Sequence, residues 1–494
     1  MTAGDWMREL AAHLERMGVA YPEEHLCIVF DIDGTIVDTR HLGVHVLLAF
    51  DRHHGTSHFL GLTADDVVAH ETQIEALLRP FALPARLRGE VATWYADHAR
   101  DPDAIAAAHR PYQGVLSVIR WFQLQPRTHV ALNTGRPESM RELTLASLNA
   151  LGRLHRVTFA SDLLFMNDGD WPTSEEAKVD GLRRLDDAGY RIVAVVDNEP
   201  SNLLAMMEAD GAGEILFLHA ETLFESQRLP LPAAVSGTEY GLSGLVREAD
   251  LGRRVTFVWH GVNDASNLRQ FMTSDVRWAE IDVRRDPLGR LVLRHDSFGQ
   301  TPWGRDEQAM MLADALETFR WVGRKVKLDL KESDGVVEEA LDLTRRYGFG
   351  DDELWFNGAI ETVGGDGLAA IRSARPGAVR SCPIDFVVPL LLAAPEEASR
   401  VLGLLRAWGV TRVSLDWATS GVRDVLDPVE ADGWEVNLYG VPDLESFLEA
   451  ALLLPASVTA DFNFPEWSYF GRGAGKGGAF HDYRLADAAA AGAR

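Results

Sequence analysis

The chain has 494 residues, 46% of them hydrophobic, so its length predicts about two to three domains, each with its own core. The formal net charge of −26 argues against polyanions such as DNA and against anionic membrane surfaces as main partners, because like charges repel at long range. Small phosphorylated molecules stay compatible as ligands, since a bound metal ion reverses the local field.

Cysteine content and the first residues bear on the compartment. Only two cysteines occur, Cys27 and Cys382, each inside an apolar run, which predicts buried thiols of a reducing compartment and neither disulfides nor a zinc cluster. The opening MTAGDWMRELAAHLERMGV predicts an amphipathic helix with acidic residues and no signal peptide. No apolar run is long enough to cross a bilayer. We therefore expect a cytoplasmic protein without an integral membrane segment.

The stretch LCIVFDIDGTIVDT at residues 26–39 is an apolar run that stops at two aspartates, a glycine and a threonine. This pattern predicts a buried strand that ends in a tight loop, with Asp31 and Asp33 at its carboxyl end. Period two along an extended chain turns both carboxylates the same way, at the edge where open α/β sheets bind ligands. Because adjacent carboxylates repel unless a cation neutralises them, the pair indicates a Mg²⁺ site. A solvated turn is the alternative for an isolated Asp-x-Asp.

VFDIDGTIVD resembles the first motif of the haloacid dehalogenase superfamily of aspartate-nucleophile phosphatases. Its other elements follow in order: THVALNTGR contains Thr134, EEAKVDGL contains Lys178, and RIVAVVDNEPSN contains Asp197. The resemblance implies that Asp31 attacks phosphorus and that Asp33 transfers the leaving-group proton. It implies that the Thr134 hydroxyl holds the transferring phosphoryl group and that the Lys178 ammonium stabilises its charge. It also implies that Asp197 binds Mg²⁺ together with Asp31 and Asp33.

Residues 40–110 carry apolar side chains at helical spacing, with proline and glycine confined to the joints. We interpret this segment as a helical cap, within a phosphatase-like domain at residues 1–224, that excludes water and selects the leaving group. After Pro111, helices alternate with strands predicted at 128–134, 157–161 and 191–197. The alternation predicts an α/β fold with a Rossmann-like, doubly wound parallel sheet.

The segment 225–250 contains proline, serine and glycine without periodicity, and we predict a linker there. From residue 251 to 470, strand-like segments alternate with amphipathic segments. The strand-like segments begin near residues 255, 278, 291, 325, 353, 378, 411, 434 and 457. About eight β/α units in a segment of this length predict a (β/α)₈ TIM barrel. The glycine-rich tail at 471–494 has little apolar content and is predicted to be flexible.

Charged side chains follow the first predicted strands of this barrel. The period-two rule turns the paired residues to one face, at the strand ends where barrel enzymes build their active sites. Three carboxylates, a lysine and two histidines in this place could hold one divalent cation and leave imidazoles for acid–base work. The alternative is a set of salt bridges inside the barrel. The residues are His260, Glu280, Asp282, His295, Asp329 and Lys331.

Four strings carry a second resemblance: HGVN at 260–263, AEIDV at 279–283, RHD at 294–296 and KLDLK at 327–331. They resemble the phosphodiesterase superfamily that contains glycerophosphodiester phosphodiesterases, sphingomyelinase D and the menorin-like proteins. The resemblance implies that the two histidines, His260 and His295, act as acid and base and that Lys331 holds a phosphate oxygen. It also implies a divalent cation, Mg²⁺ or Ca²⁺. Its ligands would be Glu280, Asp282 and Asp329.

Together the two halves predict a bifunctional phosphoric ester hydrolase. A Mg²⁺-dependent phosphomonoesterase would be fused to a metal-dependent phosphodiesterase acting on a small organic phosphodiester such as a glycerophosphodiester. Small phosphorylated substrates are the expected partners, and nucleic acid is not expected. Two alternatives stay open: a barrel that binds phosphoesters without cleaving them, and a scaffold with vestigial sites. Complete motifs in both halves count against the scaffold.

Overall fold

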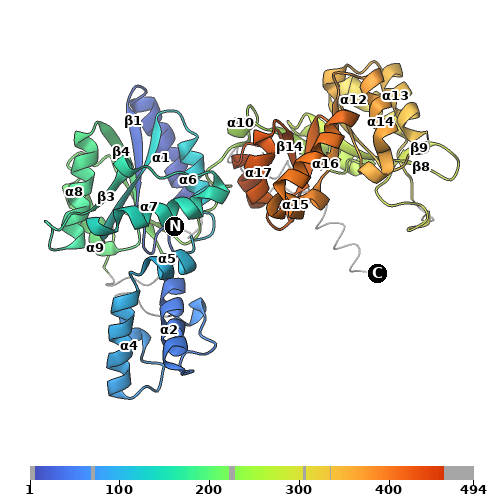
Figure 1. Cartoon of the computed structure of the whole chain (residues 1–494). Coiled ribbons are helices and arrows are strands. Elements are labelled where there is room, and N and C mark those ends of the chain that lie inside the picture. Colours follow the sequence, from blue (N-terminus) through green and yellow to red (C-terminus); the bar gives the residue numbers. More distant parts are fainter. Residues whose placement is uncertain (1–5, 68–72, 222–228, 304–306, 334, 461–494) are drawn as a thin grey trace. The chain divides into compact units, whose positions relative to one another are not determined.

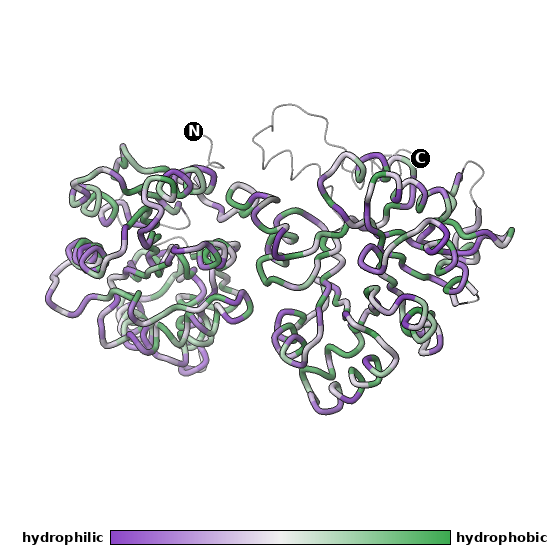
Figure 2. The backbone as a smooth tube through the Cα atoms, turned by 90° about the horizontal axis from the view of Figure 1, so that it is seen from above, coloured by the Kyte–Doolittle hydropathy of each residue, from purple (hydrophilic) through white to green (hydrophobic). Residues whose placement is uncertain are grey.

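The structure, a computed structural model, describes residues 6–67, 73–221, 229–303, 307–333 and 335–460. The chain divides into two compact units, Met1–Leu245 and Val246–Arg494 (Figure 1). Hydrophobic and hydrophilic stretches are mixed along the backbone of both units (Figure 2), as expected for amphipathic surface helices. None of the described helices combines the length and apolar character that a bilayer crossing needs. The predicted flexible tail at 471–494 lies outside the described residues.

In the first unit, the described strands form a parallel sheet in the order β3-β2-β1-β4-β5-β6. The strands are β1 (His25–Phe30), β2 (Thr128–Pro137), β3 (Leu164–Asn167), β4 (Tyr190–Asp197), β5 (Leu216–Ala220) and β6 (Val235–Gly237). The helices around them are α1 (Trp6–Ala20), α6 (Val115–Gln123), α7 (Arg141–Gly152), α8 (Ser174–Asp187) and α9 (Pro200–Ala209). The central strands are buried apolar runs, as parallel strands covered by helices must be. The predicted Rossmann-like sheet is thus confirmed.

The strand predicted at 157–161 is wrong, because the third strand, β3, begins only at Leu164. The segment before it is extended, but its backbone is satisfied by a side chain. The Asn149 amide accepts a hydrogen bond from Phe159 N at 2.8 Å and donates one to Phe159 O at 3.2 Å. A residue whose N–H and C=O are both taken in this way cannot join a strand ladder at that position.

The predicted linker at 225–250 needs correction, because part of it belongs to the first unit. Strand β6 pairs with β5. The buried Trp6 donates a hydrogen bond from Nε1 to Glu239 O at 2.6 Å, and its ring lies 4.9 Å from that of Tyr240. The Tyr240 hydroxyl donates in turn to Thr35 O at 2.9 Å. A three-residue strand carries no periodicity, so the sequence pattern could not reveal this segment.

Fragments 1–245 and 246–494 are expected to be soluble and to unfold independently, because each holds its own core. A shorter fragment, 1–224, lacks β6 and the ring that packs on Trp6. Its free energy of unfolding is expected to be lower by about 3 kcal/mol or more, the usual loss for removal of a buried aromatic side chain. Denaturant unfolding of the three fragments measures this difference. Equal stability of 1–224 and 1–245 would contradict the corrected boundary.

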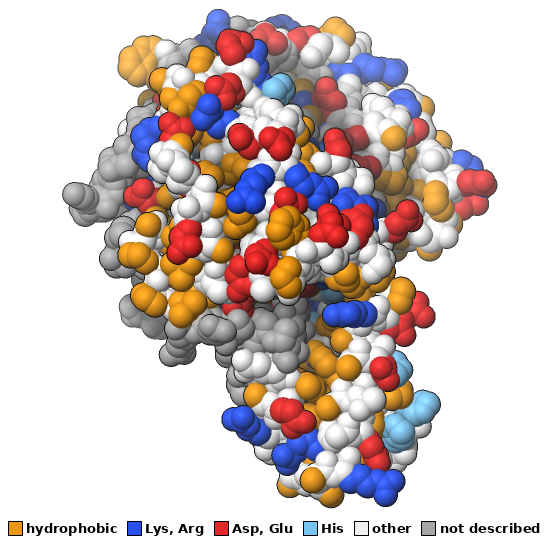
Figure 3. Space-filling view, turned by 90° about the vertical axis from the view of Figure 1, so that its left-hand side faces the viewer, with side chains coloured by type: hydrophobic (Ala, Val, Ile, Leu, Met, Phe, Trp, Pro, Cys, Tyr) orange, Lys and Arg blue, Asp and Glu red, His pale blue; other side chains and the backbone are white. Residues whose placement is uncertain are grey.

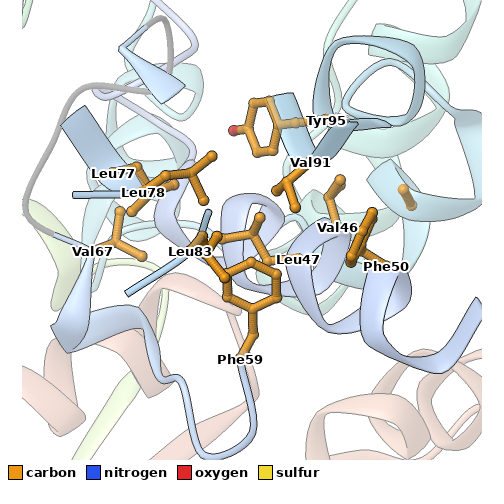
Figure 4. Close-up of a cluster of buried hydrophobic side chains, with 11 residues drawn as sticks. Val46, Leu47, Phe50, Phe59, Val67, Leu77, Leu78, Leu83, Val91 and Tyr95 are labelled. Atoms are coloured by element: carbon orange, nitrogen blue, oxygen red, sulfur yellow. The ribbon is translucent and has the colours of Figure 1, made fainter. Parts of the chain in front are cut away.

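The predicted helical cap is present in the described part of residues 40–110. Its helices are α2 (Arg40–His54), α3 (Ile74–Leu77), α4 (Ala85–His98) and α5 (Pro102–Ala108). They enclose a hydrophobic cluster of their own, in which Leu47, Phe50 and Val91 converge (Figure 4). The two chain segments that join the cap to the sheet domain are hydrogen-bonded to each other, because Asp38 N donates to Arg110 O at 2.8 Å. The cap is therefore a helical lobe with its own core, attached through two adjacent segments.

In the second unit, the described strands close a barrel of eight parallel strands in the order β7-β8-β10-β11-β12-β13-β14-β15. Strand β9 lies outside this ring, because it pairs antiparallel with β8. The strands are β7 (Thr256–Trp259), β8 (Trp278–Arg285), β9 (Leu291–Leu293), β10 (Lys325–Leu330), β11 (Leu354–Asn357), β12 (Val379–Pro383), β13 (Arg412–Asp416), β14 (Glu435–Val441) and β15 (Ser457–Ala460). The helices are α10 (Glu248–Leu251), α11 (Ala265–Thr273), α12 (Leu312–Val322), α13 (Val336–Arg346), α14 (Ile360–Ala374), α15 (Val388–Ala393), α16 (Pro395–Trp408), α17 (Val422–Ala431) and α18 (Leu444–Leu452). The predicted TIM barrel is confirmed.

Candidate active sites

The first candidate site lies at the carboxyl edge of the parallel sheet. Strand β1 lies between β2 and β4, so the residues at the ends of these three strands meet. Asp31 follows β1, Thr134 lies in β2 and Asp197 ends β4. Lys178 comes from the first turns of α8, whose N-terminus is capped by the Thr173 hydroxyl. The fold thus brings together four residues that the sequence names separately.

The Lys178 ammonium bridges two carboxylates. Its Nζ lies 2.6 Å from Asp31 Oδ1 and 2.5 Å from Asp197 Oδ2, and all three side chains are buried. Burial lowers the pKa of Lys178, but the two carboxylates outweigh it and raise that pKa above its ordinary value. Burial raises the pKa of Asp31 to about 7 against the pull of Lys178. Lys178 is therefore a permanent cation beside a carboxylate that burial has made more basic.

Asp33 accepts two hydrogen bonds from Arg136, a residue to which the sequence pattern assigned no role. Arg136 Nε and Nη2 donate to Asp33 Oδ2 and Oδ1, both at 2.6 Å, and its Nη1 donates to the buried Thr144 hydroxyl at 3.2 Å. Burial alone would raise the pKa of Asp33, but the guanidinium holds it below its ordinary value. The available signal was the position of Arg136, two residues after Thr134 in the same extended segment.

Smaller contacts fix the loop after β1. Gly34 has a φ of 80°, and a Cβ built on it would lie 2.3 Å from Asn198 Nδ2, so only glycine fits there. The Thr35 hydroxyl donates to Asp31 Oδ2 at 3.3 Å. Glu199 N donates to Asp197 Oδ1 at 2.8 Å. These contacts orient the two carboxylates that face Lys178.

A cavity of about 730 Å³ opens above this group, between the sheet edge and the cap. From the sheet domain it is lined by residues including Asp31, Asp33, Thr134, Arg136, Lys178 and Asn198. From the cap it is lined by residues including Leu42, Ile74, Tyr95, Ala96, Arg100 and Ile105. Charged groups therefore lie at one end of the cavity and mostly apolar groups at the other.

The charges at the sheet end fit a divalent cation. The carboxylates of Asp31, Asp33 and Asp197 face Lys178 and Arg136 there, and Glu175 and Glu199 also line the cavity. The net charge is therefore negative where a phosphate dianion would have to bind. A bound divalent cation would reverse that sign. Oxygen donors at the ends of neighbouring strands are also the ligands that Mg²⁺ prefers. Asp31, Asp33 and Asp197 could hold such an ion.

The second candidate site lies at the carboxyl end of three neighbouring barrel strands. Strand β8 pairs with both β7 and β10. His260 follows β7, Glu280 and Asp282 lie in β8, Asp329 lies in β10 and Lys331 follows it. Asp329 and Asp282 are direct partners in the ladder. The barrel thus brings five of the six predicted residues to one sector.

Lys331 ties the carboxylates of two strands together. Its Nζ lies 3.0 Å from Asp282 Oδ1 and 2.5 Å from Asp329 Oδ2. Burial would lower the pKa of Lys331, but the two carboxylates raise it well above its ordinary value. Burial would likewise raise the pKa of Asp329, but Lys331 brings it below its ordinary value. The salt bridges that were the alternative interpretation of these residues are therefore present.

Two buried carboxylate oxygens in this sector accept no hydrogen bond among the described residues: Glu280 Oε2 and Asp282 Oδ1. Glu280 Oε2 lies 3.3 Å from His260 Nε2, and Asp282 Oδ1 lies near Lys331, both at ion-pair distance without hydrogen-bond geometry. An unsatisfied buried carboxylate oxygen is costly unless a ligand or ion meets it. Glu280 and Asp282 therefore fit a divalent cation, with Asp329 as a third donor.

His295 is not brought to this cluster. Its ring is well exposed and its Nδ1 lies 2.9 Å from Asp296 Oδ1, while its carbonyl accepts from Arg284 Nε at 2.8 Å. The loop that carries it is nevertheless close, because Arg294 N donates to Asp282 O at 2.9 Å. Of the predicted acid–base pair, His260 is in the cluster, and the described contacts of the His295 ring are with Asp296.

Three polar residues of the barrel site were missed by the sequence reading. Asn263 Nδ2 donates to Asp282 Oδ2 at 2.6 Å, and Asn357 Nδ2 donates to Asp329 Oδ1 at 2.9 Å. Lys327 Nζ lies 3.3 Å from Glu280 Oε1, inside the barrel. Lys327 stands two residues before Asp329 on the same strand, so its period-two spacing was the available signal. Asn263 ends the string HGVN, three residues after His260.

Within the residues that the structure describes, no group of three or more His, Cys, Asp or Glu side chains is arranged as a metal site. The reason is visible in both units, since a lysine ammonium lies between the carboxylates in each. Lys178 and Lys331 hold the places that a cation would share with them.

Comparison with known proteins gives similarity to solved structures only. No family model matches the sequence, and no curated protein matches it. A glycerophosphodiester phosphodiesterase from Parabacteroides distasonis is 12% identical with a TM-score of 0.35, covering 45% of this chain and 99% of its own. One from Agrobacterium tumefaciens is 17% identical with a TM-score of 0.31, covering 44% and 99%. A HAD-superfamily hydrolase from Geobacter sulfurreducens is 15% identical with a TM-score of 0.30, covering 43% and 92%. Each of these structures covers less than half of this chain.

Proposed function

We propose that the chain is a bifunctional phosphoric ester hydrolase, with a phosphomonoesterase in its first unit and a phosphodiesterase in its barrel. One observation carries the proposal for the first unit: Asp31 lies at the charged end of a cavity, in contact with a buried lysine that also holds Asp197. A carboxylate beside a fixed cation, facing an organic-sized cavity, is the arrangement that nucleophilic attack on a phosphate ester requires.

In the proposed monoesterase reaction, an Asp31 oxygen attacks phosphorus and the ester oxygen leaves. Asp33, whose carboxylate takes up a proton once Arg136 has released it, gives that proton to the ester oxygen, so an alcohol departs and an aspartyl phosphate remains. Asp33 then takes a proton from a water molecule that attacks phosphorus, which releases phosphate and restores Asp31. Lys178 offsets the charge on the phosphoryl oxygens, and the Thr134 hydroxyl positions them.

Arg136 has a defined place in this scheme. In the structure its guanidinium is engaged by Asp33. A phosphate dianion in the cavity would compete for the same fork of N–H donors, because phosphate and carboxylate are both bound by guanidinium in two-pronged fashion. Substrate binding would then loosen the clamp and free Asp33 for proton transfer.

A Mg²⁺ ion held by Asp31, Asp33 and Asp197 would supply positive charge against the phosphoryl oxygens. In the barrel, Glu280, Asp282 and Asp329 would hold a divalent cation with the same role. Both sets of donors are carboxylates, so Mg²⁺ suits the first and Mg²⁺ or Ca²⁺ the second.

For the barrel we propose attack on phosphorus by a hydroxyl of the substrate next to the diester. One of the imidazoles, His260 or His295, takes the proton of that hydroxyl, and the other protonates the departing alcohol. Lys331 holds a phosphate oxygen. The first product is then a cyclic phosphate. The carrying observation is the Glu280 carboxylate, whose buried Oε2 accepts no hydrogen bond among the described residues and lies 3.3 Å from His260 Nε2.

The two reactions would act in sequence if the barrel opens a diester and the first unit removes phosphate from the monoester. Fusion keeps both steps at equal stoichiometry. The second candidate function is a barrel that binds phosphoesters without cleaving them. It is favoured by Lys331, whose ammonium already forms ion pairs with the carboxylates of both Asp282 and Asp329.

Removal of divalent cations tests both reactions at once. With EDTA, hydrolysis of monoesters and diesters by the whole protein and by fragments 1–245 and 246–494 is expected to fall below detection and to return with Mg²⁺. Each fragment is expected to keep only its own reaction. The measurement is a panel of phosphomonoesters and phosphodiesters followed by phosphate release and phosphorus NMR. Full activity in EDTA would contradict the cation requirement, and diester cleavage by fragment 1–245 would contradict the assignment of reactions to units.

A further inference from the structure

One wall of the cavity in the first unit is built from small residues of the cap. Ala92, Ala96 and Ala99 recur at helical spacing along α4 and its C-cap, and all three line the cavity. A larger side chain at any of these positions would take up space in front of the sheet edge. Three methyl groups therefore form part of the cap side of this cavity.

The rest of this wall is mostly apolar. Leu42 of α2, Ile74 of α3 and Ile105 of α5 line the cavity together with the alanines. When an apolar ligand displaces water from apolar surface, the free energy of binding becomes more favourable by roughly 25 cal/mol for each Å² covered. The cap therefore offers a site for the carbon skeleton of a leaving group.

Arg100 adds a single charge to this wall. It lines the cavity, and among the described residues it has no carboxylate partner. The cap end is thus apolar with one available cation, whereas Lys178 and Arg136 at the sheet end are both paired with carboxylates. On the face of the molecule seen in Figure 3, acidic and basic side chains are interspersed.

The volume of the cavity narrows the substrate class. Cavities of about 300–1,000 Å³ hold drug-sized organic molecules. A phosphoryl group bound by Asp31 and Lys178 would occupy only the charged end of about 730 Å³. If the substrate were a very small ester, water would fill the remaining space next to Ala92, Ala96 and Ala99.

We propose that the substrate of the first unit is the phosphomonoester of a large, mainly apolar alcohol, aromatic or alicyclic, that carries an anionic group at the end away from the phosphate. The apolar skeleton lies against Ala92, Ala96 and Ala99, and the anionic group pairs with Arg100. This inference rests on the proposed phosphomonoesterase activity.

Three esters test the inference on the full chain: ethyl phosphate, 2-naphthyl phosphate and 6-carboxy-2-naphthyl phosphate. The parent protein is expected to give kcat/KM values that rise in that order. Ala96→Leu is expected to lower kcat/KM for both naphthyl esters by roughly tenfold or more, as a changed pocket volume does, and to leave ethyl phosphate within twofold. Arg100→Gln is expected to abolish the preference for the carboxylated ester only.

Ala85→Leu is the matched control, because Ala85 begins the same helix, is exposed and does not line the cavity. It is expected to behave as the parent with all three esters. Equal losses on ethyl and naphthyl esters in Ala96→Leu, or unchanged values on all three, would overturn the inference. Hydrolysis of ethyl phosphate without hydrolysis of naphthyl esters by the parent would overturn it as well. Hydrolysis of none of a wide panel of monoesters would instead overturn the proposed activity on which it rests.

Discussion

Replacement of Asp31 by asparagine is expected to lower monoester hydrolysis by about 10³-fold or more, a loss typical of a removed nucleophile. The amide is nearly isosteric with the carboxylate but is a poor nucleophile. The fold should persist, because the buried Lys178 keeps its second carboxylate partner, Asp197. The measurement is phosphate release from the best monoester, with a thermal unfolding curve of the same sample.

Asp38→Asn is the matched control for this change. Asp38 belongs to the same loop, is also buried and is also paired, with Arg40 at 2.7 Å, but it does not line the cavity. Its variant is expected to keep most of the monoesterase activity. Residual activity above a tenth of the parent value in Asp31→Asn would remove Asp31 from the role of nucleophile.

The second large effect is expected in the barrel. His260→Ala and His295→Ala should each lower diester cleavage by roughly 10²-fold or more, the loss typical of a general acid or base. Substrate binding should change little, because the carboxylates of Glu280, Asp282 and Asp329 and the Lys331 ammonium stay in place. Initial rates on the best diester measure the loss, and phosphorus NMR shows whether a cyclic phosphate is the first product.

Monoesterase activity in the same samples is the internal control, since it depends on the other unit. His58→Ala, which removes an exposed imidazole from the cap, is expected to leave diester cleavage unchanged. The exposed ring of His295 makes its variant the cleaner of the two, because no core contact is lost. If both variants cleave diesters as fast as the parent, or if no diester of a broad panel is cleaved, the barrel is a binding module.

The helices and strands that were predicted correctly, and those that were not, show what a short stretch of sequence can predict. The barrel strands and the cap helices were predicted because burial imposes period two on a strand and a period near 3.6 on a helix, and both periods are visible in a short window. The segment at 157–161 has the composition of a strand, but Asn149 occupies the backbone N–H and C=O of Phe159, and Ser161 begins a 3₁₀ turn. Strand β6 is too short to show a hydrophobic period. It is stabilised by its pairing with β5 and by the hydrogen bond from Trp6 to the segment that follows it.

The sequence by itself determined which residues stand at strand ends. The positions of Asp31 and Asp33 after β1, and of Glu280 and Asp282 in β8, follow from hydrophobic runs that stop at acids, a property of neighbouring residues along the chain. The identity of the two domains as a doubly wound sheet and a barrel followed in the same way, from the alternation of such runs with amphipathic helices.

Only the tertiary structure decided how these groups are paired and what they face. Lys178 reaches Asp31 across 147 residues of sequence, and Arg136 reaches Asp33 across 103. The choice of partner depends on which charges are buried together, because a buried charge without a partner is costly and takes whichever opposite charge the packing brings near. Likewise, only the tertiary structure places Ala92, Ala96, Ala99 and Arg100 of the cap at a cavity above the sheet edge. The spacing of residues along the sequence does not predict the distance between the cap and the sheet edge, because the packing of the helices fixes that distance.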